Sequence, residues 1–219
     1  GIMPTKAWKR ETVGEDWRIG DSLNASIGQG FVLTSPLQLT LMTARLASGR
    51  AVEPKLLKSV DGVATATPQA DPIDVPSSAF DVVREGMFAV SNTRRGTAYS
   101  TRIAEETMQM AGKTGTSQVR RITKKERAAG LTSNADLPWE RRDHALFTGY
   151  APFDAPRYAV SVIVEHGGGG SRFAAPIARD IMLEALYEGQ PPETAYPASQ
   201  RTRIRNERKK LVLRDWDNV

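Results

Sequence analysis

Two β-type segments joined by a short turn constrain the fold of this chain more than any other feature. The segments "HALFTGYAP" (residues 144–152) and "RYAVSVIVEH" (residues 157–166) flank the turn "FDAP". Runs of this length that are rich in β-branched and aromatic residues are typical of strands, and the two predict an antiparallel hairpin. A third strand-like run, "TMQMAGKTGTSQV" (residues 107–119), precedes them.

Three segments carry the apolar spacing and end signals of helices. In "TSPLQLTLMTARLASG" (residues 34–49), Thr or Ser can cap the first turn, a proline suits it, and a glycine ends it. A second helix is expected from Ser77 to about Val90, capped by Ser77 or Ser78, and a third in "APIARDIMLEALYEG" (residues 175–189). Because helices precede and follow the strands, the sequence predicts an α+β fold in which helices pack on an antiparallel sheet.

The remaining segments are expected to be mostly irregular. They are residues 1–30, a short strand entering a turn at Asp61-Gly62, a connector at 64–76, a polar excursion at 120–142 that is mobile by composition, a glycine turn at 167–170, and a tail at 190–219. The tail opens with two prolines and has little apolar surface to bury, so we expect it to be largely disordered.

The charge of the chain is unevenly distributed. The net charge is +5, and residues 120–142 and 201–219 each hold seven Lys or Arg against three Asp or Glu, so the rest is slightly acidic. This pattern argues against a basic binding face built into the fold, and no nucleic-acid partner is expected. The chain has no cysteine, which excludes disulfides, a thiolate nucleophile and Cys-ligated metals.

The segment "AGKTGTSQVR" (residues 111–120) is the strongest candidate for chemistry. Lys113 can attract a carboxylate, and the hydroxyls of Thr114 and Thr116 can hydrogen-bond to the same anion. Gly115 lets a substrate backbone lie flat against the strand, and a main-chain N–H there can point at a developing oxyanion. A Lys-Thr-Gly-Thr sequence on its own is also common in surface turns.

Lys-[Ser/Thr]-Gly is one of three motifs in serine acyltransferases that bind penicillins, the others being Ser-x-x-Lys and Ser-x-Asn. No serine of this chain has a lysine three positions later. Ser22-Leu23-Asn24 matches Ser-x-Asn by letters only.

Five stretches occur together in one order and are similar to one known family. They are "GDSLNASIGQG" (20–30), "TSPLQLTLMTARLASG" (34–49), "AGKTGTSQV" (111–119), "HALFTGYAP" (144–152) and "YAVSVIVEHGGGGSRFAAPIARDI" (158–181). They strongly resemble penicillin-binding protein 2, the class B peptidoglycan transpeptidases of rod-shape elongation in Gram-negative bacteria. The resemblance covers about residues 1–189. It implies a penicillin-binding transpeptidase-like fold, present as a partial domain: the C-terminal part of the transpeptidase domain at 1–189, followed by the basic tail.

The resemblance also implies roles for the residues of the motif. Lys113 would supply the electrostatic field, Thr114 and Thr116 would bind the substrate carboxylate, and the Thr116 N–H would form half of the oxyanion hole. Gly115 and Ser117 complete the expected substrate-binding set. The parent enzyme would be a serine D,D-transpeptidase, whereas this chain lacks the nucleophile motif and is expected to be an inactive fragment alone. The Ser22–Asn24 match is expected to be a decoy, because it lies inside the first resembling stretch.

The implied partners are peptidoglycan stem peptides, β-lactams and membrane proteins of the elongation complex, with no cofactor and no metal. The implied location is the periplasm, with the parent protein anchored in the inner membrane. His144 and His166 are expected to be structural rather than a metal pair. "SIGQG" (residues 26–30) is either a helix-entry loop or a substrate-facing turn. Two alternatives remain: a non-catalytic module that binds carboxylates or other anions, and a fragment of a related serine β-lactamase.

Overall fold

The computed structural model describes residues 1–120, 122–130 and 133–211. Its helices are α1 Lys6–Val13, α2 Ile19–Ser26, α3 Pro36–Ser48, α4 Ser77–Asn92, α5 Lys124–Ala129, α6 Gly170–Leu186 and α7 Arg201–Arg208. Its strands are β1 Ser59–Val60, β2 Val63–Ala64, β3 Ala111–Ser117, β4 His144–Ala151 and β5 Tyr158–Val164. The chain is therefore an α+β protein, as predicted.

The main sheet has the strand order β3-β4-β5, with both pairs antiparallel. The predicted hairpin is β4–β5, in which Thr148 lies opposite Ser161 on one side and opposite Lys113 of β3 on the other. A separate two-stranded sheet, β1–β2, closes around the predicted turn at Asp61 and Gly62, both of which have positive φ.

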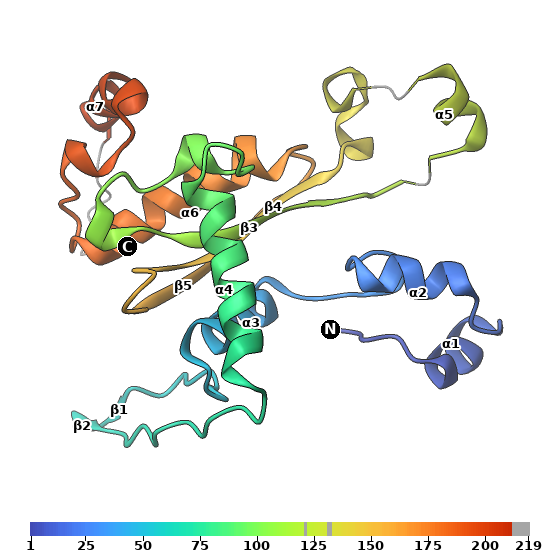
Figure 1. Cartoon of the computed structure of the whole chain (residues 1–219), viewed down its shortest axis with the longest axis horizontal. Coiled ribbons are helices and arrows are strands. Elements are labelled where there is room, and N and C mark those ends of the chain that lie inside the picture. Colours follow the sequence, from blue (N-terminus) through green and yellow to red (C-terminus); the bar gives the residue numbers. More distant parts are fainter. Residues whose placement is uncertain (121, 131–132, 212–219) are drawn as a thin grey trace.

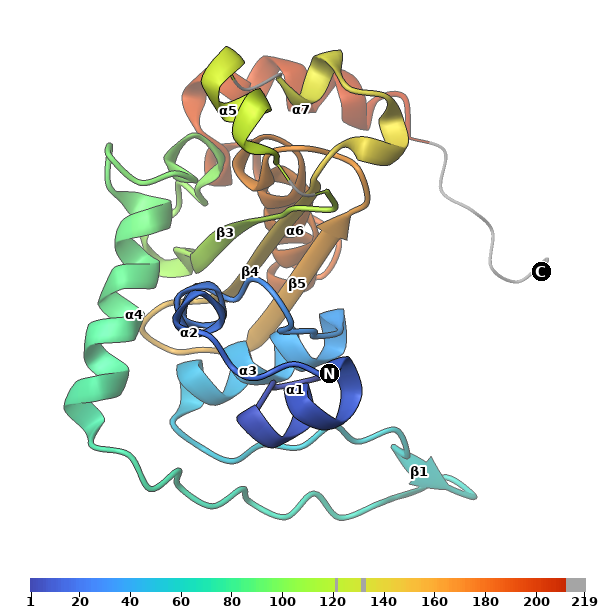
Figure 2. The same ribbon diagram turned by 90° about the vertical axis from the view of Figure 1, so that its right-hand side faces the viewer.

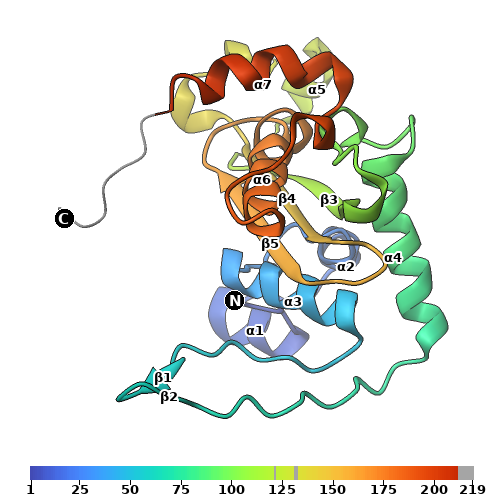
Figure 3. The same ribbon diagram turned by 90° about the vertical axis from the view of Figure 1, so that its left-hand side faces the viewer.

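Helix α6 covers one face of the main sheet (Figures 2 and 3). Phe147 of β4 is buried there with Ala174, Ala178 and Met182 of α6. Two directly paired glycines, Gly112 and Gly149, accommodate the Phe147 ring, because a Cβ on either would overlap it.

The start of α6 also lies against the sheet. A Cβ on Gly170 would overlap the carbonyl oxygen of Leu146 and lie 2.5 Å from that of Gly115. The expected glycine turn thus ends at Gly169, and its last glycine begins the helix.

Helices α3 and α4 cover the opposite face of the sheet, with α4 running along its flank (Figure 2). Thr43 of α3 is buried, and its Oγ1 lies 2.6 Å from Oγ1 of Thr148. α3 has the predicted start and end: Ser35 accepts from the Gln38 N–H, proline follows, and Gly49 takes a left-handed conformation. α4 begins at Ser77 as expected, but Pro76 occupies its cap position and neither serine caps it.

The first thirty residues are not the expected irregular segment, because they contain α1 and α2. Thr5 caps α1 by accepting from the Trp8 N–H. Lys9 is buried, and its Nζ donates to Asp21 Oδ2 at 2.7 Å and to the Asp16 carbonyl at 3.1 Å. The two helices are therefore held by a polar contact between them rather than by an apolar stripe, which is why periodicity does not reveal them.

The prediction of a disordered tail from residue 190 is corrected for residues 191–211. Short 3₁₀ turns at Glu193–Ala195 and Ala198–Gln200 lead into α7, and Ala195, Tyr196 and Ile204 are buried in the main core. Pro191 and Pro197 are buried as well, so a few apolar side chains dock a segment whose overall composition is polar. Residues 212–219 lie outside the described residues.

The polar excursion at 120–142 contains α5 and 3₁₀ turns at Asn134–Asp136 and Trp139–Arg141. It projects beyond the main sheet as an extension of β3 and β4 (Figure 1). Residues 121, 131 and 132 of this excursion lie outside the described part of the chain.

Candidate active site

Strand β3 is an edge strand in the described structure, with β4 on one side and no strand on the other. Two of its carbonyls accept side-chain hydrogen bonds: Lys113 Nζ donates to the Thr114 oxygen at 2.7 Å, and Gln29 Nε2 donates to the Thr116 oxygen at 3.3 Å. In an antiparallel strand, the N–H and C=O of one residue point to the same side. The Thr116 N–H therefore also faces the open edge.

The side chains of the motif differ in their surroundings. Lys113 and Thr116 are exposed, whereas Thr114 and Ser117 are half-buried. The Thr114 hydroxyl lies 2.9 Å from the hydroxyl of Thr97, which belongs to the loop after α4. Sequence reasoning did not identify Thr97, because seventeen residues separate the pair and no local pattern marks the contact.

A cavity of about 830 Å³ lies along the open edge. Thr116 and Ser117 line one side, and the loop after α2, including Gln29, lines the other. Gly28 and Gly30 in this loop have φ of 72° and 74°, so both take left-handed conformations. "SIGQG" is thus both the end of α2 and a wall of the cavity.

Gly115 lies between the two threonines, on the sheet face that also carries Leu146. A Cβ at this position would lie 3.2 Å from Leu146 Cβ, so even alanine would crowd it. The other side of the Gly115 backbone contacts Gly170. This close approach fixes β3 against the start of α6, which keeps its free edge in a defined position.

Ser22 contacts a tryptophan side chain. It lies on α2, and its Oγ accepts a hydrogen bond from Trp17 Nε1 at 2.8 Å. Asn24, the last residue of the same three-letter match, lines the cavity beside Thr116.

The two histidines lie together at the start of β4. The His166 N–H donates to His144 Nδ1 at 2.9 Å, and His166 Nδ1 lies 3.0 Å from the Arg142 oxygen. Their ring centroids are 4.7 Å apart, and Trp139 packs on His166. The imidazoles therefore connect β4 to the loop before α6. Among the described residues, no group of three or more His, Cys, Asp or Glu could hold a metal ion.

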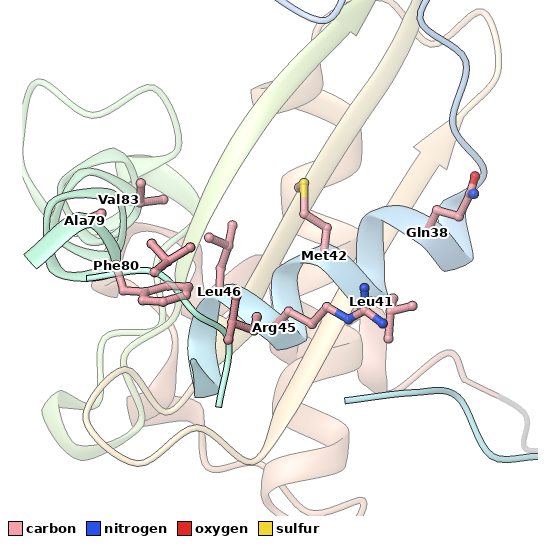
Figure 4. Close-up of a pocket in the computed structure, with 10 residues that line it drawn as sticks. Gln38, Leu41, Met42, Arg45, Leu46, Ala79, Phe80 and Val83 are labelled. Atoms are coloured by element: carbon pink, nitrogen blue, oxygen red, sulfur yellow. The ribbon is translucent and has the colours of Figure 1, made fainter. Parts of the chain in front are cut away.

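A second cavity, of about 520 Å³, lies between α3, α4 and the segment before α4 (Figure 4). Leu41, Met42, Leu46, Phe80 and Val83 line it, and Figure 4 shows Leu46 and Phe80 between the two helices. Gln38 and Arg45 are its polar lining residues, and Arg45 Nε donates to the Val52 oxygen at 2.9 Å. The rest of the lining is apolar and includes no residue of the β3 motif.

Comparison with known proteins identifies the family. The family model for the penicillin-binding protein transpeptidase domain matches residues 1–183. Peptidoglycan D,D-transpeptidase MrdA of Haemophilus influenzae is 34% identical over 218 residues, which cover 95% of this chain and 33% of that protein.

Solved structures agree with this assignment. Pseudomonas aeruginosa PBP2 in complex with WCK 5153 is 36% identical with a TM-score of 0.68, covering 90% of this chain and 41% of that one. Helicobacter pylori PBP2 in complex with MreC is 34% identical with a TM-score of 0.68, covering 86% of this chain and 31% of that one.

This chain spans about a third of the length of the curated relative, so the likeness concerns one part of those proteins. Its predicted penicillin-binding transpeptidase fold is confirmed. The chain therefore belongs to the penicillin-binding protein transpeptidase family, within the PBP2/MrdA group of peptidoglycan D,D-transpeptidases.

Proposed function

We propose that this chain provides the substrate edge of a D,D-transpeptidase that cross-links peptidoglycan stem peptides during rod-shape elongation. The observation that supports this most directly is the open edge of β3, where the Thr116 N–H points outward and Thr116 and Ser117 line a cavity that Lys113, Thr114 and Gly115 do not line. The names of the MrdA and PBP2 relatives support the choice of reaction. On this proposal, residues 1–189 are the C-terminal part of the catalytic domain.

The residues of β3 would divide the work of binding and charge stabilisation. Thr114 and Thr116 hydroxyls bind the terminal carboxylate of the stem peptide, and Lys113 supplies the positive charge beside it. The Thr116 N–H donates to the oxygen of the carbonyl under attack, and loss of one such donor typically costs on the order of 10²–10³ in rate. Gly115 leaves room for the peptide, and Ser117 forms the adjoining wall.

The nucleophile would be a serine outside these 219 residues, because none of the serines here begins a Ser-x-x-Lys. Its hydroxyl attacks the penultimate D-alanine carbonyl, forms an ester and releases the terminal D-alanine. The amine of a second stem peptide then attacks the ester, forms the cross-link and frees the serine. A β-lactam would acylate the same serine.

The proposed partners and location also follow from the relatives. The Helicobacter pylori PBP2 structure contains MreC, which supports a membrane protein of the elongation complex as a partner. We place the whole protein in the periplasm with an inner-membrane anchor. Within the part of the chain that the structure describes, no helix combines the length and apolarity that a membrane span requires.

Acylation by a fluorescent penicillin tests this proposal. Intact-mass analysis should find no adduct on this chain alone, and a stoichiometric adduct on one of its serines would contradict the proposed source of the nucleophile. In a longer protein that joins this chain to a Ser-x-x-Lys segment, Lys113→Ala should slow acylation far more than it lowers the melting temperature. Unchanged acylation would remove Lys113 from the site.

A further inference from the structure

The cavity beside Thr116 continues into a neighbouring one. This neighbouring cavity, of about 580 Å³, is lined by Asn24, Gln118, Ile122, Thr123, Lys124 and Arg127. It shares Asn24 and Gln118 with the cavity at Thr116. We call the two cavities together the groove: its lining extends from Thr116 of β3 to Lys124 and Arg127 of α5. Figure 1 shows α5 on the projecting excursion and α2 on the same side of the molecule.

The charged residues that line this groove are all basic: Arg120, Lys124 and Arg127. The nearby carboxylate of Glu126 is already engaged, since it accepts from Arg120 at 2.7 Å and from the Thr123 N–H at 2.8 Å. The hydrogen bonds from the Thr123 N–H and hydroxyl, followed by that from Arg120, hold the pKa of the Glu126 carboxyl below its ordinary value. Arg120 is thus compensated, whereas Lys124 and Arg127 form no ion pair with any described residue.

The direction of a bound stem peptide follows from the proposed roles of β3. If the terminal carboxylate lies at Thr114 and the carbonyl under attack at the Thr116 N–H, the rest of the peptide continues toward Ser117 and Gln118. Gln118 lies two residues beyond Thr116, or about 7 Å at 3.3 Å per extended residue. A long side chain on the residue before the D-Ala pair therefore extends past Ser117 toward Gln118 and the basic end of the groove.

We propose that Asn24, Gln118, Lys124 and Arg127 form a subsite for a carboxylate on the stem peptide upstream of the reacting D-alanine pair. The proposal rests on the proposed function, because that function sets the direction of the peptide. The subsite selects stem peptides by an anionic side chain, and the excursion at 120–142 supplies its two cations.

Fluorescence anisotropy tests the subsite with two labelled peptides, on the longer protein that joins this chain to a Ser-x-x-Lys segment and whose motif serine is replaced by alanine. One ends in Glu-D-Ala-D-Ala and the other in Gln-D-Ala-D-Ala. Their side chains are nearly equal in size and differ by one negative charge. The acidic peptide should bind about fivefold more tightly at low salt, the sum of two partly exposed ion pairs, and the difference should shrink at high salt. The double variant Lys124→Gln/Arg127→Gln should bind both peptides alike, with the affinity of the amide peptide unchanged.

Lys6→Gln/Lys58→Gln is the matched control, because both lysines are exposed and lie outside the groove. It removes the same net charge and should keep the fivefold preference. Equal binding of both peptides by this longer protein without further substitutions would overturn the subsite alone. A preference that survives in the double variant would do the same, while binding of neither peptide would overturn the proposed function together with it.

Discussion

The N-terminal segment, residues 1–33, and the C-terminal segment, residues 190–211, attach to the sheet in different ways. The first passes the open edge of β3, and in the described residues its single hydrogen bond to the sheet is Gln29 to Thr116. The second docks on α6 through buried Ala195, Tyr196 and Ile204. It also carries backbone and side-chain bonds to the body, including the Ala104 N–H to the Ala195 oxygen at 2.7 Å.

The buried arginine of α6 shows how the C-terminal segment is held. Arg179 is fully buried, donates to Gln200 and lies 4.9 Å from the Tyr196 ring, whose other contact is Arg208 at 5.4 Å. The N-terminal segment instead exposes Ile19, Leu23 and Ile27 along α2. The C-terminal segment therefore contributes to the stability of the body, by which we mean the main sheet and the helices packed on it. The N-terminal segment contributes mainly to the shape of the site.

The largest effect is expected from Tyr196→Ala. It removes a buried aromatic ring and leaves Arg179 without its stacking partner, so the free energy of unfolding should fall by about 3 kcal/mol or more. Urea denaturation followed by circular dichroism measures it. Tyr158→Ala is the control, since Tyr158 is 41% exposed, and should cost less than about 1 kcal/mol. Equal losses for the two variants would mean that the C-terminal segment does not stabilise the body.

A second effect should be confined to the N-terminal segment. Lys9→Met keeps the apolar stem but removes the charged hydrogen bond to Asp21, so amide exchange in α1 and α2 should accelerate roughly tenfold. Amides of β4 should exchange at the unmodified rate, because no described contact joins Lys9 to the sheet. Hydrogen exchange read by mass spectrometry separates the two regions, and acceleration in β4 would show that the segment supports the core.

A smaller effect is expected at the contact between the N-terminal segment and the site. Gln29→Ala removes the bond to the Thr116 oxygen, and affinity for a D-Ala-D-Ala peptide should fall about threefold, with no change in unfolding free energy. Anisotropy and denaturation on the same preparation provide both values. If Gln29→Ala lowers stability but leaves affinity intact, the loop is structural and does not shape the site.

The smallest expected effect is the response of the Lys9–Asp21 contact to low pH. The hydrogen bond from Lys9, followed by that from the Arg18 N–H, holds the pKa of Asp21 below 3.8, so its contribution is present above that pH and is lost as pH falls through the lower folded value. Indole NMR signals of Trp8 and Trp17 should shift in this range, and Asp21→Asn should abolish the pH dependence.

The C-terminal segment should respond less to acid, because the pKa shifts of two carboxyls, Asp180 on the neighbouring α6 and the segment's own Glu193, have opposite signs. Burial raises the pKa of Asp180, whose contribution is present at low pH and is lost as pH rises through the folded value. Arg205 lowers the pKa of Glu193, whose contribution is lost as pH falls. A larger acid response in the C-terminal segment would reverse the comparison.

The sequence predicted those elements whose signals lie within or next to the element itself. The proline and glycine that bound α3, and the turn between β4 and β5, are adjacent to the residues they organise, so these elements were predicted. Contacts between distant residues were not: Arg179 meets Gln200 twenty-one residues later, and Gln29 meets Thr116 eighty-seven residues later. Sequence therefore located the β3 motif and offered "SIGQG", which contains Gln29, as one possible substrate-facing turn. The contacts of Gln29 and Thr97 with the motif, however, are seen only in the fold.

The glycines of the sheet have a consequence for how the protein tolerates change. Gly112, Gly149 and Gly170 each lie where a Cβ would overlap a neighbouring ring or carbonyl, and Gly115 leaves less than normal clearance. At such positions the Cβ itself causes most of the steric overlap. Alanine, ordinarily the mildest replacement, should therefore destabilise the protein nearly as much as valine or leucine. A Cβ on Gly170 would meet backbone atoms of Leu146 and Gly115, so no smaller side chain at either position could make room for it. A Cβ on Gly115 would instead meet the Leu146 side chain, so a smaller residue at 146 could offset that enlargement. Sequence drift is therefore more restricted at Gly170 than at Gly115.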